Sequence, residues 1–489
     1  MVNVGENRTL DLGRWAAAAA GERVLGRRLR SDSRAVDAGD VFVALGRGDR
    51  VGTHIAQALD RGAAVVLVDL EVVETGGASG DPRVRGVRGL RDVIGALADD
   101  YTGRPSADMT LVGVTGTNGK TSTVQLLAQS WDRLGITAAS IGTLGAGLHG
   151  ALVQTALTTP SVVEMHELLA DLRAAGARAV GIELSSHALA QGRGDGCRFD
   201  IAAFTNLTRD HLDYHGSMDE YAAVKRRILT LRGIRAAVLN LDDPFVGSLV
   251  PPAGVRRVGV STMRRGAAEV SAGDIRLRGD GADFTLDIDG ERIEVRSPLI
   301  GRFNVDNIAM TAAILHAHGV RAADIATAVG DIARVPGRMQ VVHAGGDGAP
   351  RVVVDYAHTP DGLQQALAAF ASRAGRLVLV FGCRGDRDRG KRPEMARIAE
   401  VGADVVVLTD DDVHHEDGDA IIADVLAGFR RADAVHVDRD RASAIRDAIA
   451  AAGPDDTVLI AGKGHETSRL VGDEVVPFDD VRIAASALP

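Results

Sequence analysis

Aromatic residues, cysteine and lysine are scarce in this chain of 489 residues, and each scarcity excludes a class of protein. Aromatic residues make up 3% of the chain and the formal net charge is −10, so no basic, aromatic-rich surface for nucleic acid is expected. The two cysteines, Cys197 and Cys383, are far apart and form neither a disulfide framework nor a metal motif. No segment is apolar for long enough to span a bilayer or to act as a secretion signal. We therefore expect a cytoplasmic protein that neither enters membranes nor binds nucleic acid.

Lysine occurs only at positions 120, 225, 391 and 463, although Lys and Arg together number 56. Arginine serves wherever a plain positive charge is enough, so the remaining lysines indicate places that need a primary amine or a compact charge. All four lie inside recognisable motifs, which are described below. The alternative is an arginine-biased genome that leaves a few lysines at random.

The length of the chain is too great for one hydrophobic core, and its patterns predict three α/β domains, at residues 1–105, 106–335 and 336–489. The first domain alternates short strands with helices. The second contains short apolar runs separated by helical segments, which predicts a mostly parallel central sheet of the phosphate-loop type, with a small β-insert over 255–297. The third repeats the alternation and predicts a doubly wound, Rossmann-like unit.

A glycine-rich segment, residues 113–121, follows an apolar run and precedes a helical segment over 122–134. This order is typical of a phosphate-binding loop, whose backbone N–H groups and helix N-terminus hold phosphate oxygens. We expect Lys120 to reach the β- and γ-phosphates of ATP and the Thr121 hydroxyl to bind Mg²⁺. The glycines recur every three residues, which departs slightly from the usual spacing, and a purely structural turn is the alternative. The loop residues assigned to ATP are Gly116, Thr117, Asn118, Gly119, Lys120, Thr121 and Ser122.

Polar side chains stand at the ends of three further predicted strands, where parallel sheets bind their ligands. Glu183 ends one strand and His211 lies shortly after the next, so both are candidates to hold Mg²⁺. Imidazole more often binds softer ions, and a buried structural histidine is the alternative for His211. Asp355 ends a strand of the third domain, where a carboxylate can accept from a ribose hydroxyl; a helix N-cap cluster is the alternative.

Arginines crowd one loop of the third domain, directly after a predicted buried strand. Such a density of positive charge is costly unless an anion or a carboxylate neutralises it, so the loop is a candidate anion site. A solvated charged loop is the alternative. The residues concerned are Arg384, Arg387, Arg389, Lys391 and Arg392.

Together these motifs resemble the Mur ligases of peptidoglycan synthesis over nearly the whole chain, and most closely those that add the third residue of the peptide. Residues 32–34 and 39–45 resemble the UDP-binding first domain of that family. The most specific matches lie at 158–160, 183–187 and 204–216, and others at 301–307, 355–360 and 462–466. The resemblance implies that residues 1–105 bind the UDP-sugar, 106–335 bind ATP, and 336–489 bind the incoming amino acid.

The resemblance also implies roles for individual residues. Lys120, Glu183, His211 and Lys225 would be catalytic. Lys225 would be carbamylated, and its new carboxylate would hold metal together with Thr121, Glu183 and His211, which arginine could not do. Asn304, Asn307, Arg338 and Asp355 would contact the nucleotide. Ser33, Thr158, Thr159, Ser185, Gln191 and Arg193 would line the path of UDP-N-acetylmuramoyl-L-alanyl-D-glutamate. Arg387, Gly462 and Glu466 would bind the free amino acid.

The implied reaction uses ATP to make a poor acyl donor reactive. The substrate carboxylate takes the γ-phosphoryl group of ATP to form an acyl phosphate, with Mg²⁺ and Lys120 spreading the charge of the transfer. The amine of the amino acid then attacks, and phosphate leaves. Domain closure would align the substrates and exclude water. We expect a monomer.

One segment departs from the family pattern at the position that contacts the amino acid. The family commonly reads Asp-Asn-Pro-Arg there for meso-diaminopimelate, and this chain has Asp412, Val413 and His414 in place of the last three. Histidine is shorter, mostly neutral at pH 7 and unable to make a bidentate fork. The segment 409–417 is also rich in acids, which favours a distal ammonium. The sequence therefore predicts L-lysine or L-ornithine as the added residue, with meso-diaminopimelate as the alternative. A further alternative is that the acids merely face solvent and cap the following helix.

Rival functions share parts of the pattern. A folylpolyglutamate synthase and the pentapeptide-completing Mur ligase have the same ATP core, but residues 32–34 argue against the former and residues 185–187 and 211–215 against the latter. A non-catalytic, ATP-gated regulatory protein would not need the full set of metal and amino-acid residues. Residues 46–54 lack the usual Asp-Gly pair of the first domain, which weakens predictions for the uridine pocket.

Overall fold

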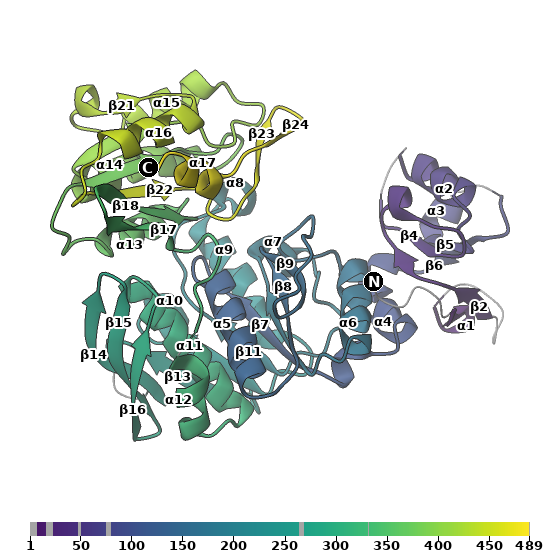
Figure 1. Cartoon of the computed structure of the whole chain (residues 1–489). Helices are drawn as coiled ribbons and strands as arrows, with labels where there is room; N and C mark the ends of the chain where they lie inside the picture. The colour runs from purple at the N-terminus through teal and green to yellow at the C-terminus, as the bar shows by residue number, and fades with distance from the viewer. Residues whose placement is uncertain are drawn as a thin grey trace.

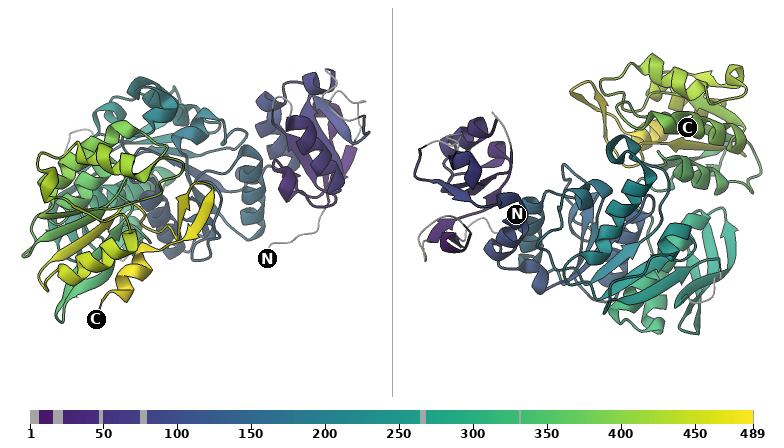
Figure 2. Two further views of the ribbon diagram at one scale, coloured as in Figure 1. Left: turned by 90° about the horizontal axis from the view of Figure 1, so that it is seen from above. Right: turned by 180° about the vertical axis from the view of Figure 1, so that it is seen from behind.

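A computed structural model describes residues 7–15, 23–46, 50–74, 80–263, 268–330 and 332–488. These residues form three main sheets from three successive stretches of the chain, and helices cover the sheets. In Figure 1 the N-terminal part (purple) stands at one end, the central part (blue to green) lies in the middle, and the C-terminal part (green to yellow) packs against it. Figure 2 shows the same arrangement from two other sides. The predicted three-part α/β fold is confirmed.

The N-terminal part is a small parallel sheet in the order β3-β4-β5-β6, preceded by the antiparallel pair β1 and β2. Its strands are β1 (Arg8–Asp11), β2 (Arg23–Gly26), β3 (Leu29–Arg30), β4 (Val41–Ala44), β5 (Val65–Asp69) and β6 (Val84–Val87). Its helices are α1 (Leu12–Trp15), α2 (Arg50–Asp60), α3 (Leu70–Glu74) and α4 (Leu90–Tyr101). Residues 47–49 of the predicted uridine-pocket segment lie outside the described residues.

The central sheet runs in the order β16-β15-β14-β13-β12-β11-β7-β10-β8-β9 and is parallel from β14 to β8. Its strands are β7 (Thr110–Thr115), β8 (Ala138–Gly142), β9 (Gly145–Leu148), β10 (Ala179–Glu183), β11 (Ile201–Phe204), β12 (Ala236–Asn240), β13 (Arg256–Ser261), β14 (Val270–Arg278), β15 (Gly281–Ile288) and β16 (Glu291–Ser297). Its helices are α5 (Lys120–Arg133), α6 (Val162–Ala174), α7 (Ser186–Ala190), α8 (Leu212–His215), α9 (Met218–Arg226), α10 (Pro244–Gly247), α11 (Arg302–His318) and α12 (Ala322–Gly330). The predicted β-insert is therefore no separate unit: β14, β15 and β16 extend the same sheet.

The C-terminal sheet runs in the order β17-β18-β22-β19-β20-β21, and only its edge strand β17 is antiparallel to its neighbour. Its strands are β17 (Gln340–Gly346), β18 (Ala349–Asp355), β19 (Leu377–Phe381), β20 (Val405–Leu408), β21 (His436–Val437) and β22 (Thr457–Ala461), and the hairpin β23 (Ser468–Val471) and β24 (Glu474–Pro477) follows. Its helices are α13 (Pro360–Ala368), α14 (Arg392–Gly402), α15 (Gly418–Leu426), α16 (Arg441–Ala451) and α17 (Asp480–Ser486).

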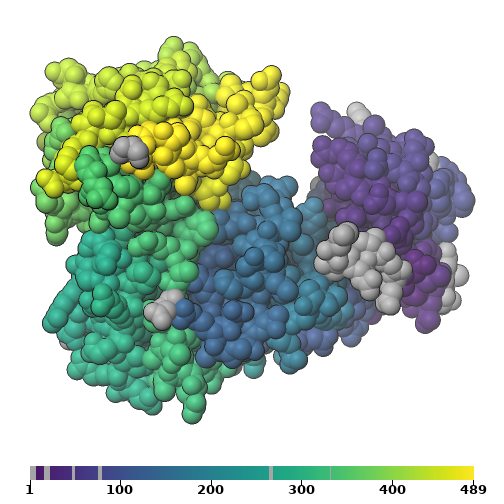
Figure 3. Space-filling view, in the orientation of Figure 1, coloured from purple at the N-terminus to yellow at the C-terminus, as the bar shows by residue number. Residues whose placement is uncertain are grey.

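Buried polar contacts join the N-terminal part to the central part. The carboxylate of Glu167 on α6 accepts from Arg8 at 2.7 Å and from the backbone N–H of Leu29 at 2.8 Å. Arg28 adds an ion pair to Asp171, one turn further along α6. Figure 3 shows that the N-terminal and C-terminal parts are separated by a gap on this face, with the central part below it. In the described ranges, no helix combines the length and apolarity needed to cross a membrane.

Candidate active site

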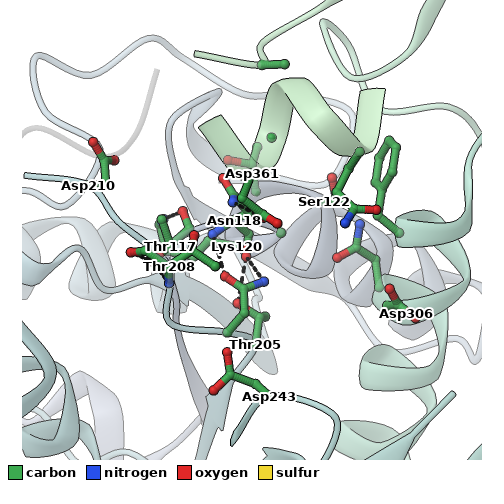
Figure 4. A pocket seen from close by; sticks show the side chains of 18 of the residues that line it. Thr117, Asn118, Lys120, Ser122, Thr205, Thr208, Asp210, Asp243, Asp306 and Asp361 are labelled. Carbon is green, nitrogen blue, oxygen red and sulfur yellow. Dashed lines mark hydrogen bonds between the residues drawn. The ribbon is translucent and has the colours of Figure 1, made fainter. Parts of the chain in front are cut away.

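A cavity of about 530 Å³ lies between the central and C-terminal parts. It is lined by the loop after β7, by the residues that follow β10, β11 and β12, by α11, and by the loops after β18 and β19 of the C-terminal sheet. Adjacent parallel strands end at the same edge of a sheet, so residues far apart in sequence meet here. Figure 4 shows Thr117, Asn118 and Lys120 gathered beside Asp361 of the C-terminal part.

The glycine-rich loop has the predicted strand–loop–helix setting, because β7 ends at Thr115 and α5 begins at Lys120. Gly116 has φ 148°, and a Cβ there would lie 1.8 Å from Oγ1 of Thr205. The ammonium of Lys120 donates to the carbonyl oxygens of Gly116 and Thr117, both at 2.8 Å. Burial lowers the pKa of Lys120. The loop therefore holds a half-buried amine against two carbonyls, where an entering phosphate can compete for it.

The predicted metal ligands Thr121 and Glu183 meet at the end of β10. The Thr121 hydroxyl donates to Glu183 at 2.9 Å, and the same carboxylate accepts from the backbone N–H of Thr143 at 2.9 Å. Glu183 is fully buried, and the described residues give it no ion pair. Burial lowers the pKa of His211 to about 4, so its imidazole is neutral at pH 7. A buried carboxylate without a cationic partner, a hydroxyl and a neutral imidazole suit a divalent cation.

Lys225 is almost as deeply buried as Glu183, with 1% of its surface exposed. Its Nζ donates to the carbonyl oxygen of Gly116 at 2.7 Å and lies 4.8 Å from the ring centroid of Tyr221. Burial, reinforced by the charge of Lys120, lowers the pKa of Lys225 well below its usual value. A neutral amine is the form that reacts with carbon dioxide, so the environment of Lys225 fits the predicted carbamate.

The residues expected to contact the nucleotide come from three elements. Asn307 packs against the glycine-rich loop, since a Cβ at Gly119 would lie 2.6 Å from its Oδ1. Asn304 accepts from Asn307 at 3.2 Å and donates to a backbone carbonyl, so it positions its neighbour and does not itself line the cavity. Arg338 donates to the Thr121 hydroxyl at 3.0 Å and brings the C-terminal part onto the loop.

Asp355 lines the cavity, but both of its carboxylate oxygens already accept backbone hydrogen bonds. Met339 N–H donates at 2.7 Å and Ala357 N–H at 2.8 Å. Burial raises the pKa of Asp355. The N-cap of α13 is Thr359. Asp355 therefore holds the backbone at Met339, where the C-terminal part begins, to the end of β18. The predicted contact with a ribose would be additional to these two hydrogen bonds.

The predicted sugar-peptide residues are spread over two parts of the molecule. Thr158 and Ser185 line the cavity. Behind them, Thr159 accepts from Arg193 through its backbone carbonyl at 2.7 Å, and Arg193 also donates to Gln191 at 2.7 Å. Ser33 lies in the N-terminal part, where its hydroxyl donates to Gln57 at 2.8 Å, and it does not line the cavity.

Among the predicted amino-acid residues, Arg387 lines the cavity, whereas Asp412, His414, Gly462 and Glu466 are not part of its described lining. Lys463 is fully buried and donates to Asp412 at 2.8 Å and to Glu466 at 3.0 Å. His414 has φ 51° and a pKa lowered by burial, and its backbone bonds to the β23–β24 hairpin.

Sequence reasoning missed the contacts that join the central and C-terminal parts across the cavity. Asn118 donates to Asp361 at 2.7 Å, and Arg209 donates twice to Asp388, both times at 3.1 Å. Lys391, one of the scarce lysines, is buried with its Nζ 3.9 Å from Asp210. The scarcity of lysine in the chain singled out Lys391, but no residue near it in the sequence indicates that its partner is Asp210.

Known proteins resemble this chain over nearly its full length. Residues 114–315 match the family model "Mur ligase middle domain", and residues 337–464 match "Mur ligase, glutamate ligase domain". A UDP-N-acetylmuramoyl-L-alanyl-D-glutamate–2,6-diaminopimelate ligase of Xanthomonas campestris is 53% identical over 94% of this chain and 92% of its own length. A protein of the same name from Pseudomonas aeruginosa is 44% identical over 94% and 95%. A solved structure of a ligase with this name is 34% identical, with a TM-score of 0.66 over 95% of this chain and 94% of that one.

The prediction of L-lysine or L-ornithine as the added residue is wrong, because these relatives are named as 2,6-diaminopimelate ligases. The structure supplies the physical reason: the acids of the 409–417 segment are neutralised by cations from elsewhere in the C-terminal part, so they create no field that selects an ammonium. The pairs are Asp410 with Arg439, Asp411 with Arg384 and Lys463, Asp412 with Lys463, and Glu416 with Arg389 and Arg392, while Asp417 caps α15.

Proposed function

This chain belongs to the Mur ligase family and is an ATP-dependent acid–amino acid ligase, and we propose that it adds meso-diaminopimelate to UDP-N-acetylmuramoyl-L-alanyl-D-glutamate in peptidoglycan synthesis. The observation that carries the proposal is the 53% identity over 94% of the chain to a ligase named for this reaction. The cavity supports it, because the glycine-rich loop and Arg387 line the same space.

The proposal divides the work among three domains. Residues 1–105, with Ser33, bind the UDP end of the sugar nucleotide; residues 106–335 bind ATP and the peptide; residues 336–489 bind the amino acid. The N-terminal sheet stands at one end of the central sheet and the cavity at the interface with the C-terminal sheet, which suits a long substrate that reaches from one to the other.

Mg²⁺ fits the residues present, because Thr121, Glu183 and His211 offer a hydroxyl, an unpaired buried carboxylate and a neutral imidazole. Lys225 would join them after reacting with carbon dioxide, in which its Nζ forms the N–C bond and releases one proton. When bound, the metal neutralises the phosphate charge that builds up during phosphoryl transfer.

The side chains of the cavity then carry out the ligation. Lys120 turns from the carbonyls of its own loop to the phosphates of ATP, which favours attack by the substrate carboxylate on the γ-phosphorus. ADP leaves, and the acyl phosphate is held where the C-terminal part covers the cavity. The amine of diaminopimelate attacks the acyl carbon, loses a proton, and expels phosphate. Contacts such as Asn118–Asp361 and Arg209–Asp388 hold the two parts together and exclude water.

Phosphate release from ATP tests the proposal, measured with UDP-N-acetylmuramoyl-L-alanyl-D-glutamate and with meso-diaminopimelate, L-lysine or L-ornithine in turn. We expect release with meso-diaminopimelate, dependent on both the sugar peptide and the amino acid. Efficient release with lysine or ornithine but not with diaminopimelate would refute the assigned substrate.

Substitution of Lys225 tests the carbamate. Lys225→Ala should abolish turnover, and a short-chain carboxylic acid should restore part of it by replacing the missing carboxylate. Lys225→Arg is the matched control: it keeps a positive charge but cannot form the carbamate, so it should be as inactive as the alanine variant. Full activity in the arginine variant would show that a cation, not a carboxylate, is needed at this position.

A further inference from the structure

The position at which the family commonly places arginine to bind the distal carboxylate holds His414 in this chain. Burial lowers the pKa of His414, and an uncharged imidazole cannot form an ion pair with a carboxylate. Diaminopimelate differs from lysine by that one distal carboxylate. If the proposed function holds, on which this inference rests, another cation of the C-terminal part must receive this carboxylate.

The arginines that crowd the loop after β19 divide into two groups. Arg389 and Arg392 donate to Glu416, with N–O distances of 2.8 Å and 2.7 Å, so they hold the 409–417 segment in place. Arg384 and Arg387 line the cavity instead. The resemblance already assigns Arg387 to the amino acid, which leaves Arg384 as the cavity-lining arginine of this loop without a role.

Arg384 lies next to the segment that carries His414. Its Nη2 donates to both carboxylate oxygens of Glu466, at 2.6 Å and 2.5 Å. Its Nε is 3.6 Å from Asp411 and 3.8 Å from Asp412, the residue two before His414. The guanidinium is therefore held on one side by three carboxylates, which fix its position without any contribution from a ligand.

One edge of this guanidinium remains available to a ligand. Nη1 of Arg384 makes no hydrogen bond with the described residues, and 17% of the side chain is exposed at the cavity. Two neighbouring cations are less suitable. Lys463 is fully buried and already occupied by Asp412 and Glu466, and Arg469 donates to the backbone of Asp411 without lining the cavity.

We infer that Arg384 binds the distal carboxylate of diaminopimelate and thereby selects this amino acid over lysine. The carboxylate accepts from Nη1, while Glu466 and Asp411 keep the guanidinium oriented towards the cavity. Lysine leaves Nη1 without a partner in a site closed to water, which is how a polar site rejects an analogue that lacks the matching group. In the family, an arginine at the position of His414, after β20, commonly binds this carboxylate. In this chain Arg384, after β19, takes that role.

The test compares two amino acids in four forms of the full-length enzyme. We would measure kcat and KM for meso-diaminopimelate, and the inhibition constant of L-lysine as a competing ligand, in the wild type, Arg384→Gln and Arg384→Lys. Arg397→Gln is the matched control: it follows the same loop on α14, but its side chain is exposed and does not line the cavity. KM values for ATP and for the sugar peptide report on the integrity of the rest of the site.

In Arg384→Gln we expect kcat/KM for meso-diaminopimelate to fall about 30- to 100-fold through KM, the loss typical of a charged hydrogen-bonded pair. The inhibition constant of L-lysine and both other KM values should stay within about threefold, Arg384→Lys should retain part of the affinity, and Arg397→Gln should match the wild type. Equal losses for diaminopimelate and lysine in Arg384→Lys, which keeps the charge beside Glu466, would show a structural role and overturn the inference. So would unchanged kinetics in Arg384→Gln. A wild type that does not use diaminopimelate at all would instead refute the proposed function.

Discussion

A fully buried ion pair joins the C-terminal helix α17 to α16. Arg441 at the start of α16 and Asp480 at the start of α17 are both 0% exposed. The guanidinium donates to the carboxylate through Nε at 2.9 Å and Nη2 at 2.8 Å, and Nη2 also donates to the carbonyl of Ala461 at 3.0 Å. Ala461 ends β22 and directly precedes the segment 462–466, so the pair also holds the start of that segment.

The substitution Asp480→Asn removes the carboxylate that hydrogen-bonds to the buried arginine and leaves it only the more distant charges of Asp411 and Asp412. Breaking a buried pair in this way costs about 3–5 kcal/mol, because the remaining charge cannot be solvated. Replacing both partners by apolar residues of similar volume, as in Arg441→Met with Asp480→Leu, removes the charge altogether and should recover most of the loss. The exposed pair Arg321–Asp324 is the matched control, and Asp324→Asn should leave stability unchanged.

Hydrogen exchange followed by mass spectrometry is the suitable assay, since a chain of several domains does not unfold in one two-state step. A cost of about 3–5 kcal/mol corresponds to amide exchange about 10²- to 4 × 10³-fold faster in α17 and β22. KM for the amino acid should rise in the same variant, while KM for ATP stays constant. Unchanged protection of α17 and β22 in Asp480→Asn would refute the reasoning, as would a double variant less stable than the single one.

Two further substitutions test other parts of the site. Gly116→Ala should abolish ATP binding measured by calorimetry, because the new Cβ would lie 1.8 Å from Oγ1 of Thr205. Gly330→Ala is the control, because its Cβ would meet open space and its backbone needs no positive φ, so it should bind ATP normally. Equal binding by both would contradict the close packing of the loop. Hydrogen bonding to Arg392 lowers the pKa of Glu416 to about 2, below its value of about 4.3 in the unfolded chain. Its stabilising contribution is therefore present above about pH 5 and is lost as the pH falls towards 2. Hydrogen exchange of the 409–417 segment and α15 in Glu416→Gln, compared with the wild type at the same pH, should accordingly show a loss of protection at pH 7 that shrinks at pH 4. A loss independent of pH would contradict the ion pair.

Local patterns predicted the elements that carry the site. The strand at 110–115 and the helix at 120–133 flank the glycine-rich loop as expected, because a short apolar run, glycines and a helix start are all encoded within about 25 residues. The strands that end at Glu183 and Asp355 were also predicted correctly from their apolar runs. Parallel strands expose their ends at one edge, so the approximate position of the site followed from the pattern alone.

The strands after β13 show where local patterns were insufficient. Residues 270–297 alternate polar and apolar side chains, which predicts strands but not the sheet that they join. In the structure β14 pairs with β13 and continues the central sheet. Sheet membership depends on hydrogen bonds to a strand elsewhere in the chain, and a single strand's pattern carries no information about its partner.

What the sequence by itself determined is the family, the phosphate-binding loop and the order of strands and helices, because each is written in residues close together along the chain. Only the tertiary structure decided the net charge around the 409–417 segment, which was predicted to contact the amino acid. Counted along the sequence, the 409–417 segment is strongly acidic; in space, Asp411 meets Arg384, which is 27 positions away, and Lys463, which is 52 positions away. Electrostatic interactions depend on distance through space and on burial, not on separation along the chain, so the cations that cancel those acids could not be recognised until the fold brought them together.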